Sequence, residues 1–357
     1  LTTMLAGFLV NLGLTPLIIY LAHRNQWYDE LNHRKIHTED IPRLGGVGIF
    51  SALLVAVAIA FIIVNGYPSA VRSSSEQAVF WQLLAYFAPI IGGMIVIFLV
   101  GLVDDFRNLR ALLKLVIQVA AAAIVTLGPF RIERITIPFI WYNVELGLFS
   151  YPATVLWIVA VSNAVNFIDG IDGLAGGSSA IAALFFSVSA LLVGQELPAL
   201  FAIGLFGSLL AFLVYNSPPA RIFMGDSGSY VLGFSLSVIP LVLADGTGDS
   251  LDLIPGITIL AVPILDMTTA VFRRMRRGKH PFSADREHIH HRLMDIGLGT
   301  WRILTVVYIT CIIAGLTAVS WYLLPKNVDM AVILAVWALM IALVASLTAR
   351  VHRKSQS

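Results

Sequence analysis

Long apolar runs, each about as long as a membrane-spanning helix, follow one another along almost the whole chain. A helix that crosses a bilayer needs about 20 mostly apolar residues. By this criterion the sequence predicts eleven spans, at residues 3–22, 45–65, 83–103, 111–128, 151–166, 174–194, 198–215, 227–244, 253–272, 303–323 and 329–349. The pattern therefore predicts an all-α integral membrane protein, organised as a single multi-pass domain over residues 1–357.

One connecting segment has a pattern typical of β-structure. Residues 129–150 alternate apolar and polar side chains and are rich in β-branched and aromatic residues. Such alternation favours strands over helix. We therefore expect a small β-hairpin on the extracytoplasmic surface.

The distribution of basic residues predicts how the chain is oriented. Eleven crossings would place the two termini on opposite faces of the membrane. Of the 23 Lys and Arg residues, one face receives only Arg72, Arg131, Arg134 and Lys326. Cytoplasmic loops carry the excess of Lys and Arg in membrane proteins. The sequence thus predicts an N-terminus outside and a C-terminus in the cytoplasm.

Composition supports this class and excludes others. Hydrophobic residues make up 58% of the chain and charged residues 12%, whereas soluble domains are about a quarter charged. This excludes a cytosolic globular enzyme, a disordered chain and a fibrous one. The net charge of +2 needs only a preference for one side of a membrane, and no nucleic-acid partner is expected. The single cysteine, Cys311, excludes a disulfide framework and a multi-cysteine metal site.

Acidic residues at the ends of the predicted spans are the most informative polar positions. Carboxylates near a bilayer are expensive and tend to be functional. Five of them fall on three separate loops of the predicted cytoplasmic face: Asp104, Asp105, Asp169, Asp172 and Asp226. Five acids in one cleft would repel one another unless a cation or basic side chains offset their charge.

The first acidic group is the pair Asp104-Asp105, followed by Lys114. Adjacent side chains on a helix point about 100° apart. One carboxylate could therefore hold a metal ion or an acceptor while the other supports it. A solvated helix end capped by Asp explains the pair equally well.

The second group lies in the run NAVNFIDGIDGLAGG over residues 163–177, which contains Asn163, Asn166, Asp169 and Asp172. Its glycines allow positive φ and a close approach of a ligand to the backbone. The helix that follows presents free N–H groups to an anion. A purely structural turn would not need Asn or Asp every three residues, so we interpret this run as functional.

The third group is the loop FMGDSGS, residues 223–229. A Gly-Asp-Ser-Gly sequence at the start of a helix is compatible with a metal or phosphate site. It is also compatible with Asp226 acting as a plain N-cap.

The fourth group is basic and rich in histidine, over residues 273–292. Its arginines, Arg274 among them, could simply anchor lipid headgroups. The spacing of His288, His290 and His291 can direct imidazoles at a common phosphate. A zinc site is the alternative, but clustered Asp and Asn suit a hard cation such as Mg²⁺.

Two further features remain open. Asp266 lies within the ninth predicted span, either at the floor of a pocket or paired with a neighbouring helix. The first inner loop, residues 29–46, is basic and ends in Gly45-Gly46, which fits phosphate contact or a simple inside anchor.

Together these motifs resemble a known family. The runs GLVDDFRNLRALLK, NAVNFIDGIDGLAGG, FMGDSGS and FRRMRRGKHPFSADREHIHHRL occur in this order, after an opening RKIH and IPRLGG. They resemble the bacterial polyprenyl-phosphate N-acetylhexosamine-1-phosphate transferases of glycosyltransferase family 4. The HIHH form of the histidine motif resembles the WecA/TagO-like branch more than the peptidoglycan branch represented by MraY.

The resemblance implies a reaction. The substrates would be UDP-N-acetylglucosamine (UDP-GlcNAc) and undecaprenyl phosphate, and the products UMP and undecaprenyl-pyrophosphoryl-N-acetylglucosamine. This would be the first lipid intermediate of a cell-surface polysaccharide, such as O-antigen or teichoic acid. The enzyme would sit in the cytoplasmic (inner) membrane with its active site on the cytoplasmic face, and homodimers are expected.

The resemblance also implies residue roles. Asp226 and Asn166 would hold Mg²⁺, with Mn²⁺ as an alternative ion. Catalytic roles would fall to Asp104, Asp105 and Asp169, with Asp104 or Asp105 as the base. Substrate contacts would come from Lys114, Asn163, Asp172, Arg274, His288, His290 and His291. Direct attack by the lipid phosphate is favoured over a covalent Asp intermediate.

A different class of function gives the main alternative. An ion-coupled transporter would place ionisable residues near mid-membrane on broken helices, within repeated halves. Here only Asp266 lies clearly inside a predicted span, and no repeat is visible. The sequence leaves the N-acetylhexosamine and the downstream polymer open.

Overall fold

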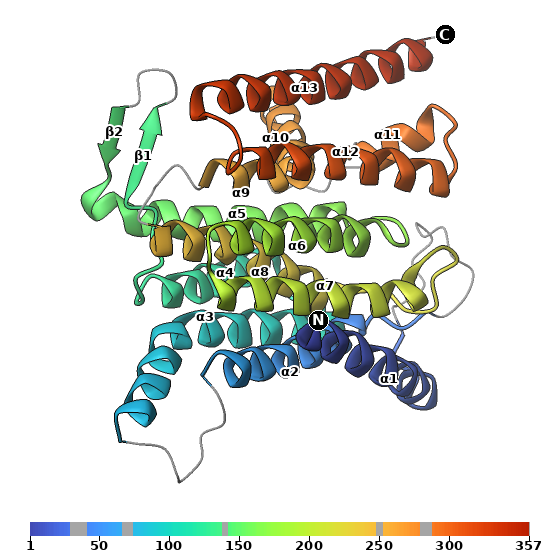
Figure 1. Ribbon diagram of the computed structural model, residues 1–357. Helices are drawn as coiled ribbons and strands as arrows, with labels where there is room; N and C mark the ends of the chain where they lie inside the picture. Colours follow the sequence, from blue (N-terminus) through green and yellow to red (C-terminus); the bar gives the residue numbers. More distant parts are fainter. Residues whose placement is uncertain (29–40, 66–73, 138–141, 248–252, 279–287, 357) are drawn as a thin grey trace.

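The computed structural model describes residues 1–357 apart from 29–40, 66–73, 138–141, 248–252, 279–287 and 357. The chain forms a bundle of helices with one small two-stranded sheet (Figure 1). Along the chain the elements are α1 (Thr2–Asn25), α2 (Gly45–Asn65), α3 (Ser74–Arg107), α4 (Ala111–Val125), β1 (Arg134–Ile137), β2 (Tyr142–Glu145), η1 (Gly147–Phe149), α5 (Ser150–Ile168), α6 (Leu174–Leu192), α7 (Glu196–Asn216), α8 (Gly225–Thr247), α9 (Leu253–Ile259), α10 (Ala261–Arg276), α11 (Ile289–Asp295), α12 (Thr300–Ser320) and α13 (Lys326–Gln356). The predicted all-α membrane class is confirmed.

All eleven predicted spans coincide with helical segments. Among the described residues, nine helices are long and apolar enough to cross a membrane. The short segment predicted at 151–166 is one of them, because its helix begins earlier and runs to Ile168. The segment predicted at 111–128 is the shorter helix α4, of 15 residues. The protein is therefore a multi-pass membrane protein.

The ninth predicted span is helical, but it is not one continuous helix. It is divided into α9 and α10, which are bent by 76° relative to each other at Leu260. Pro263 explains the break, because proline has no N–H to donate to the carbonyl of Ile259 and its ring clashes there. The bend points α10 in a new direction, and α10 carries Asp266 and Arg274.

The predicted hairpin is present. Strands β1 and β2 pair antiparallel, with Arg134 opposite Glu145 and Ile137 opposite Tyr142. The hairpin and the short helix α11 lie at opposite ends of the bundle (Figure 1). Since the chain enters α5 just after the hairpin, Asp169 at the other end of α5 lies about 28 Å away along the helix axis.

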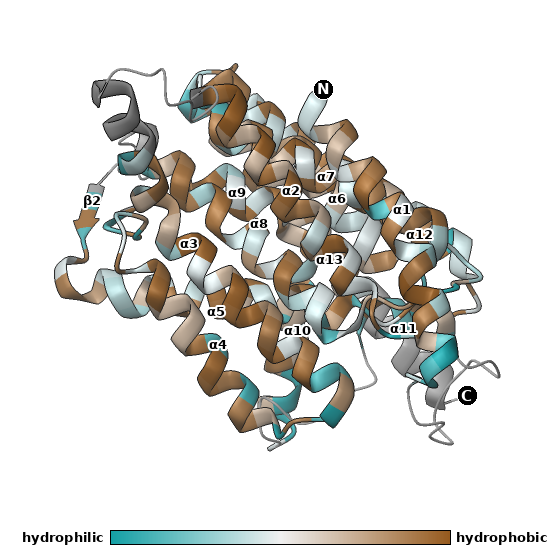
Figure 2. Ribbon diagram, turned by 90° about the horizontal axis from the view of Figure 1, so that it is seen from below, coloured by the Kyte–Doolittle hydropathy of each residue, from teal (hydrophilic) through white to brown (hydrophobic). Residues whose placement is uncertain are grey.

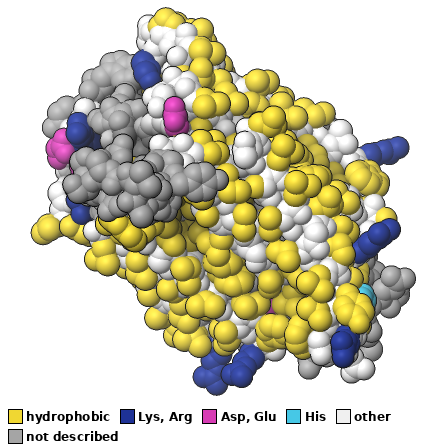
Figure 3. Space-filling model, turned by 60° about the horizontal axis from the view of Figure 1, so that its bottom comes forward, with side chains coloured by type: hydrophobic (Ala, Val, Ile, Leu, Met, Phe, Trp, Pro, Cys, Tyr) yellow, Lys and Arg dark blue, Asp and Glu magenta, His cyan; other side chains and the backbone are white. Residues whose placement is uncertain are grey.

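Helix α8 forms the centre of the bundle. It packs against α2, α3 and α5. Within the most apolar stretch of α8, 94% is buried inside the protein, whereas the corresponding share for α1 is 17%. Hydrophobic residues cover most of each helix, while hydrophilic residues gather at helix ends and loops (Figure 2). One outer face is mainly hydrophobic, with Lys and Arg near its edges (Figure 3). The start of α8, with Asp226, is thus held in a well-packed position.

Candidate active site

The ends of α3 and α8 meet at the end of the bundle away from the hairpin. The Lys114 ammonium, on α4, lies 2.9 Å from Asp104 Oδ2 and 3.0 Å from Asp226 Oδ2. The other oxygen of Asp104 accepts a hydrogen bond from the backbone N–H of Leu109, at 2.6 Å. The two carboxylates, predicted on separate loops, therefore converge on one cation.

Asp105 has a different environment from its neighbour. Its carboxylate accepts hydrogen bonds from the N–H groups of Asp226 and Ser227, at 2.6 and 3.1 Å, and from the Ser227 hydroxyl. Asp105 thus caps the N-terminus of α8 from another helix, where a negative charge is favourable. This leaves the Asp226 side chain, considered above as a plain N-cap, free to face Lys114.

A glycine makes this capping possible. Gly225 has φ +73°, and a Cβ placed there would lie 2.2 Å from Arg43 O and 2.7 Å from the Asp105 carboxylate oxygens. No L-residue with a side chain fits both the backbone conformation and the space. Gly225 therefore lets Asp105 reach the start of α8.

Asp104, Asp105 and Asp226 form what we call the acidic cluster, and Asn166 of the run 163–177 contacts it. Its amide donates to Asp226 Oδ1 at 3.1 Å and to Ser229 Oγ at 2.8 Å. No described residue donates a hydrogen bond to its side-chain carbonyl oxygen, Oδ1. Asn163, one turn earlier, donates instead to Gln118 Oε1 at 2.7 Å and to Val159 O at 2.8 Å. Both bonds use Nδ2, so the predicted substrate contact of Asn163 would fall to its side-chain oxygen.

Asp169 interacts electrostatically with carboxylates of all three acidic loops. Burial raises its pKa to about 7, nearby Asp226, Asp105 and Asp172 add to the rise, and Arg43 opposes it. No described residue donates a hydrogen bond to its carboxylate. Within the described parts of the chain, Asp169 thus differs from the other four predicted acids, which each accept a hydrogen bond.

Asp172 and Asn216 hold the neighbouring loop in place. Asp172 Oδ2 accepts from the N–H of Ala220 at 3.0 Å. The Asn216 side chain accepts from Gly173 N at 3.0 Å and donates to Ile222 O at 2.8 Å. Our sequence analysis did not single out Asn216; its only signal is a polar residue at the apolar end of α7, before two prolines.

The first inner loop belongs to the site as well. Its end pairs with the chain before α8 through Gly45 N to Phe223 O at 3.0 Å and Gly46 N to Met224 O at 2.8 Å. A Cβ at Gly46 would lie 2.2 Å from Gly228 N, so the close contact requires glycine. The loop thus has a structural role beside Asp226, and the rest of it, residues 29–40, lies outside the described residues.

The histidine segment reaches the same region from the bent span. His288 Nδ1 lies 2.8 Å from Asp266 Oδ2. Its ring centroid lies 5.5 Å from that of Phe167, and the Arg274 guanidinium lies over the same Phe167 ring at 5.5 Å. Because Phe167 follows Asn166 in the chain, His288 and Arg274 lie next to the second acidic loop.

His290 packs directly against Gly170. A Cβ on Gly170 would lie 2.3 Å from His290 Nε2, so the missing side chain accommodates the imidazole. Positive φ in this run occurs at Gly173, at +79°, and not at Gly170. Burial, together with His291 and His288, lowers the His290 pKa to about 4, and Asp266 opposes this. His291 adjoins His290, with ring centroids 4.3 Å apart.

The oxygen donors at this site suit a hard cation. Mg²⁺ usually takes one or two protein carboxylates and completes its shell with water and substrate phosphate. Asp226 with the Asn166 carbonyl oxygen, beside Asp104, matches that donor set. Within the described parts of the chain, no three His, Cys, Asp or Glu side chains form a closed metal site. The arrangement therefore fits an ion bound together with a phosphate ligand.

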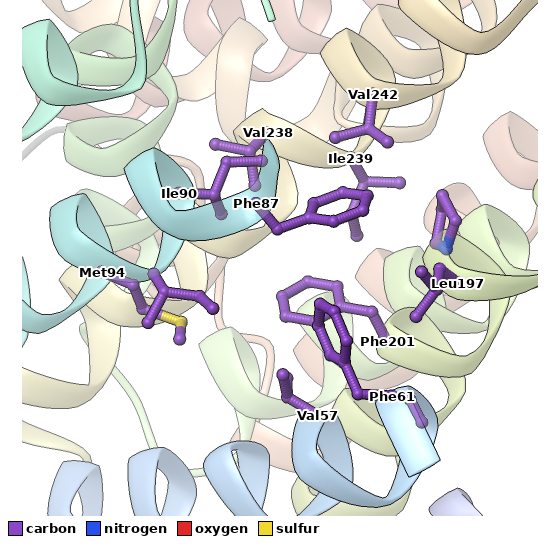
Figure 4. A pocket seen from close by; sticks show the side chains of 13 residues that line it. Val57, Phe61, Phe87, Ile90, Met94, Leu197, Phe201, Val238, Ile239 and Val242 are labelled. Atoms are coloured by element: carbon purple, nitrogen blue, oxygen red, sulfur yellow. The ribbon is translucent and has the colours of Figure 1, made fainter. Parts of the chain in front are cut away.

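An apolar cavity of about 60 Å³ lies elsewhere, between α2, α3, α7 and α8 (Figure 4). Only hydrophobic side chains line it, including Phe61, Phe87, Met94 and Phe201. Met94 is the lining residue of α3 nearest to Asp104 in sequence, about 15 Å away along the helix. Without a polar group, this cavity cannot carry the chemistry of the acidic cluster.

Comparison with known proteins decides the family. Residues 87–244 match the family model described as glycosyl transferase family 4. The chain is 34% identical over 316 residues to a probable undecaprenyl-phosphate N-acetylglucosaminyl 1-phosphate transferase of Bacillus subtilis, covering 88% of this chain and 83% of that protein. The chain belongs to the polyprenyl-phosphate N-acetylhexosamine-1-phosphate transferase family.

Other relatives of this transferase agree. A decaprenyl-phosphate N-acetylglucosaminephosphotransferase of Mycobacterium leprae is 32% identical over 345 residues, covering 90% of this chain and 84% of that protein. An undecaprenyl-phosphate alpha-N-acetylglucosaminyl 1-phosphate transferase of Escherichia coli K12 is 28% identical over 274 residues, with 75% and 69% covered. The protein is thus an enzyme, a phosphoglycosyltransferase, which disfavours the transporter alternative.

Proposed function

We propose that this transferase moves N-acetylglucosamine-1-phosphate from UDP-GlcNAc to undecaprenyl phosphate, forming undecaprenyl-pyrophosphoryl-N-acetylglucosamine and UMP. The observation that carries the proposal is the convergence of Asp104 and Asp226 on Lys114, with Asn166 beside them. Two carboxylates and an ammonium suit a reaction between two phosphate compounds. The names of the three relatives support the N-acetylglucosamine.

The acceptor and the location are also part of the proposal. Relatives in Bacillus subtilis and Escherichia coli are named for undecaprenyl phosphate, and the one in Mycobacterium leprae for decaprenyl phosphate. We favour the undecaprenyl lipid in the cytoplasmic membrane, with the site on the cytoplasmic face. The excess of Lys and Arg in loops at that end supports this side. The product would start a cell-surface polysaccharide.

Asp226 and the Asn166 carbonyl oxygen would hold Mg²⁺, or Mn²⁺ in its place. When bound, the ion neutralises the diphosphate and stabilises the leaving group. Lys114 would then contact phosphate oxygens as a positive charge. Arg274, His288, His290 and His291 would bind the remaining diphosphate or sugar oxygens, since arginine and phosphate form strong hydrogen bonds.

We propose direct attack by the lipid phosphate. One of its oxygens bonds to the β-phosphorus of UDP-GlcNAc, and the bond from that phosphorus to the oxygen of UMP breaks, with UMP taking the electron pair. A phosphate monoester has a second pKa of about 6, so the acceptor is mostly a dianion at pH 7. No base is then needed, and Asp104 would act by holding the Lys114 ammonium toward the acceptor phosphate, while Asp169 would contact the acceptor only in its protonated form.

Asp105 has a distinct place in this scheme. Its oxygens accept backbone N–H groups of α8, so it would position Asp226 without serving as base or nucleophile. Asp172 would likewise hold the wall of the nucleotide pocket through Ala220. Homodimer formation stays a prediction.

The test is a transfer assay with the purified, lipid-reconstituted protein. Radiolabelled UDP-GlcNAc and UDP-N-acetylgalactosamine are offered with undecaprenyl or decaprenyl phosphate, with and without Mg²⁺. We expect UMP release and a lipid product only with UDP-GlcNAc, undecaprenyl phosphate and Mg²⁺ together. Absence of a labelled lipid in every combination would rule the proposal out.

A pair of variants locates the reaction. Asp226→Asn keeps the size of the side chain and should abolish transfer while the protein stays folded. Asp295→Asn, on the exposed end of α11, should leave transfer unchanged. Normal turnover by Asp226→Asn would remove Asp226 from the metal site.

A further inference from the structure

Asp266 is the one carboxylate within α9 and α10, and only 1% of its surface is exposed. Both of its oxygens are used. Oδ2 lies 2.8 Å from His288 Nδ1, and Oδ1 accepts from the backbone N–H of Ile289 at 2.7 Å. One side chain on α10 therefore holds the first residue of α11 and the histidine before it.

This contact determines how the imidazole is presented. With Nδ1 toward the carboxylate, the opposite edge of the ring, which carries Nε2, faces away from α10. The ring lies beside Phe167 and parallel to that of His290, at centroid distances of 5.5 and 6.0 Å. Phe167 is the residue between Asn166 and Ile168, so the imidazole adjoins the acidic loops.

We propose that Asp266 is a positioning residue for the transfer reaction. It keeps Nδ1 of His288 protonated and the ring fixed, so that Nε2 is directed at the diphosphate or sugar of the donor. A carboxylate behind an imidazole has this effect in metal sites and hydrolases, where it selects the tautomer and orients the ring. The inference rests on the proposed function for the identity of the donor.

Burial argues that Asp266 does more than join two helices. A carboxylate in this environment is costly unless paired, and apolar contacts could hold α11 without it. Ile289 and Leu293 already belong to an apolar cluster with Val262 of α10 and Val307 of α12. The carboxylate adds what those contacts cannot, namely a defined proton on His288.

The experiment combines Asp266→Asn with His288→Gln. An asparagine can still accept from Ile289 N, but its NH₂ group would donate to Nδ1 and shift the imidazole proton to Nε2. ¹⁵N NMR of histidine-labelled protein reports this directly, with the signal assigned by its loss in His288→Gln. We expect a protonated Nδ1 in the wild type, an unprotonated Nδ1 in Asp266→Asn, and a fall in kcat of about 100-fold.

The double variant separates positioning from general stability. If Asp266 acts through His288, Asp266→Asn should cost nothing further in the His288→Gln background, because the two effects are coupled. Asp329→Asn, which removes another fully buried carboxylate on α13, should change neither the His288 signal nor kcat. Asp266→Glu should retain the protonated Nδ1 and part of the activity.

Two results would overturn the inference. One is an additive loss, in which Asp266→Asn lowers kcat equally with and without His288. The other is an unchanged Nδ1 signal in Asp266→Asn. A wild type that makes no lipid product would refute the proposed function instead, while the NMR signal would still report the pair.

Discussion

The acidic cluster and the histidine segment reach the same site in different ways. In the cluster, Asp104, Asp105 and Asp226 are held by partners from several helices, including the central helix α8. The histidine segment is held by apolar contacts of α11, by the buried carboxylate of Asp266 and by the space that Gly170 leaves for His290. The acidic cluster is therefore part of the bundle core, whereas the histidine segment packs onto the outside of that core.

Removing the cap of α8 should have the largest effect on the acidic cluster. Asp105→Ala deletes acceptors for two backbone N–H groups, which should destabilise the protein by about 1–3 kcal/mol. Because Asp226 would lose its position, transfer should fall more than 1,000-fold. Thermal unfolding in detergent and the transfer assay measure the two effects. A stable, active variant would show that Asp105 does not hold the cluster.

Lys114→Met tests what balances the charges within the cluster. The ammonium now lies between Asp104 and Asp226, where it competes with a divalent ion. Without it, the two carboxylates should bind Mn²⁺ about tenfold more tightly, a change of about 1.4 kcal/mol, while transfer falls about 100-fold. Titration followed by electron paramagnetic resonance measures the affinity. Weaker Mn²⁺ binding would mean that Lys114 assists the ion and does not compete with it.

Gly170→Ala should disturb the packing of the histidine segment against the bundle and leave the acidic cluster in place. Its Cβ would lie 2.3 Å from His290 Nε2 and 2.4 Å from Cε1, so the histidine segment must shift. We expect transfer to fall about 10- to 100-fold with Mn²⁺ affinity unchanged, since the three atoms nearest to this Cβ all belong to His290. Gly278→Ala would be a poor control because Gly278 has φ +67°, but Gly299→Ala meets no atom within 4 Å. Loss of Mn²⁺ binding in Gly170→Ala would show that the two regions are not separate.

The smallest expected effect is a pH dependence of opposite sign in the two regions. The folded pKa of His290 is lowered from 6.5 to about 4. Its contribution to stability is therefore present above pH 6.5 and lost as the pH falls toward 4. The folded pKa of Asp169 is raised from 3.8 to about 7. Its contribution is present below pH 4 and lost as the pH rises through 7.

Two variants test how the stability of the metal-free protein changes with pH. His290→Gln should reduce the loss of melting temperature between pH 6.5 and 5, and Asp169→Asn should raise the melting temperature at pH 8, each by a few degrees. Parallel slopes for the wild type and both variants would contradict the opposite environments of the two side chains.

Much of the fold follows from local pattern. Apolar runs such as 45–65 and 198–215 must form helices in a membrane, because only a helix satisfies its own backbone there. The alternating residues of 129–150 likewise predicted the hairpin. The bend at Leu260 was missed, since Pro263 near one end of an apolar run is compatible with a kink, a break or neither.

The sequence by itself determined which chemical groups are present and that they lie at the ends of apolar helices, because hydropathy and helix length are local properties. The sequence could not show which of these carboxylates has which role. Asp104 and Asp105 are adjacent and identical, yet one faces Lys114 and the other caps α8. Only the tertiary structure decided this, as it decided the pairing of Asp266 with His288, because each role depends on which distant backbone or side chain packs against the carboxylate.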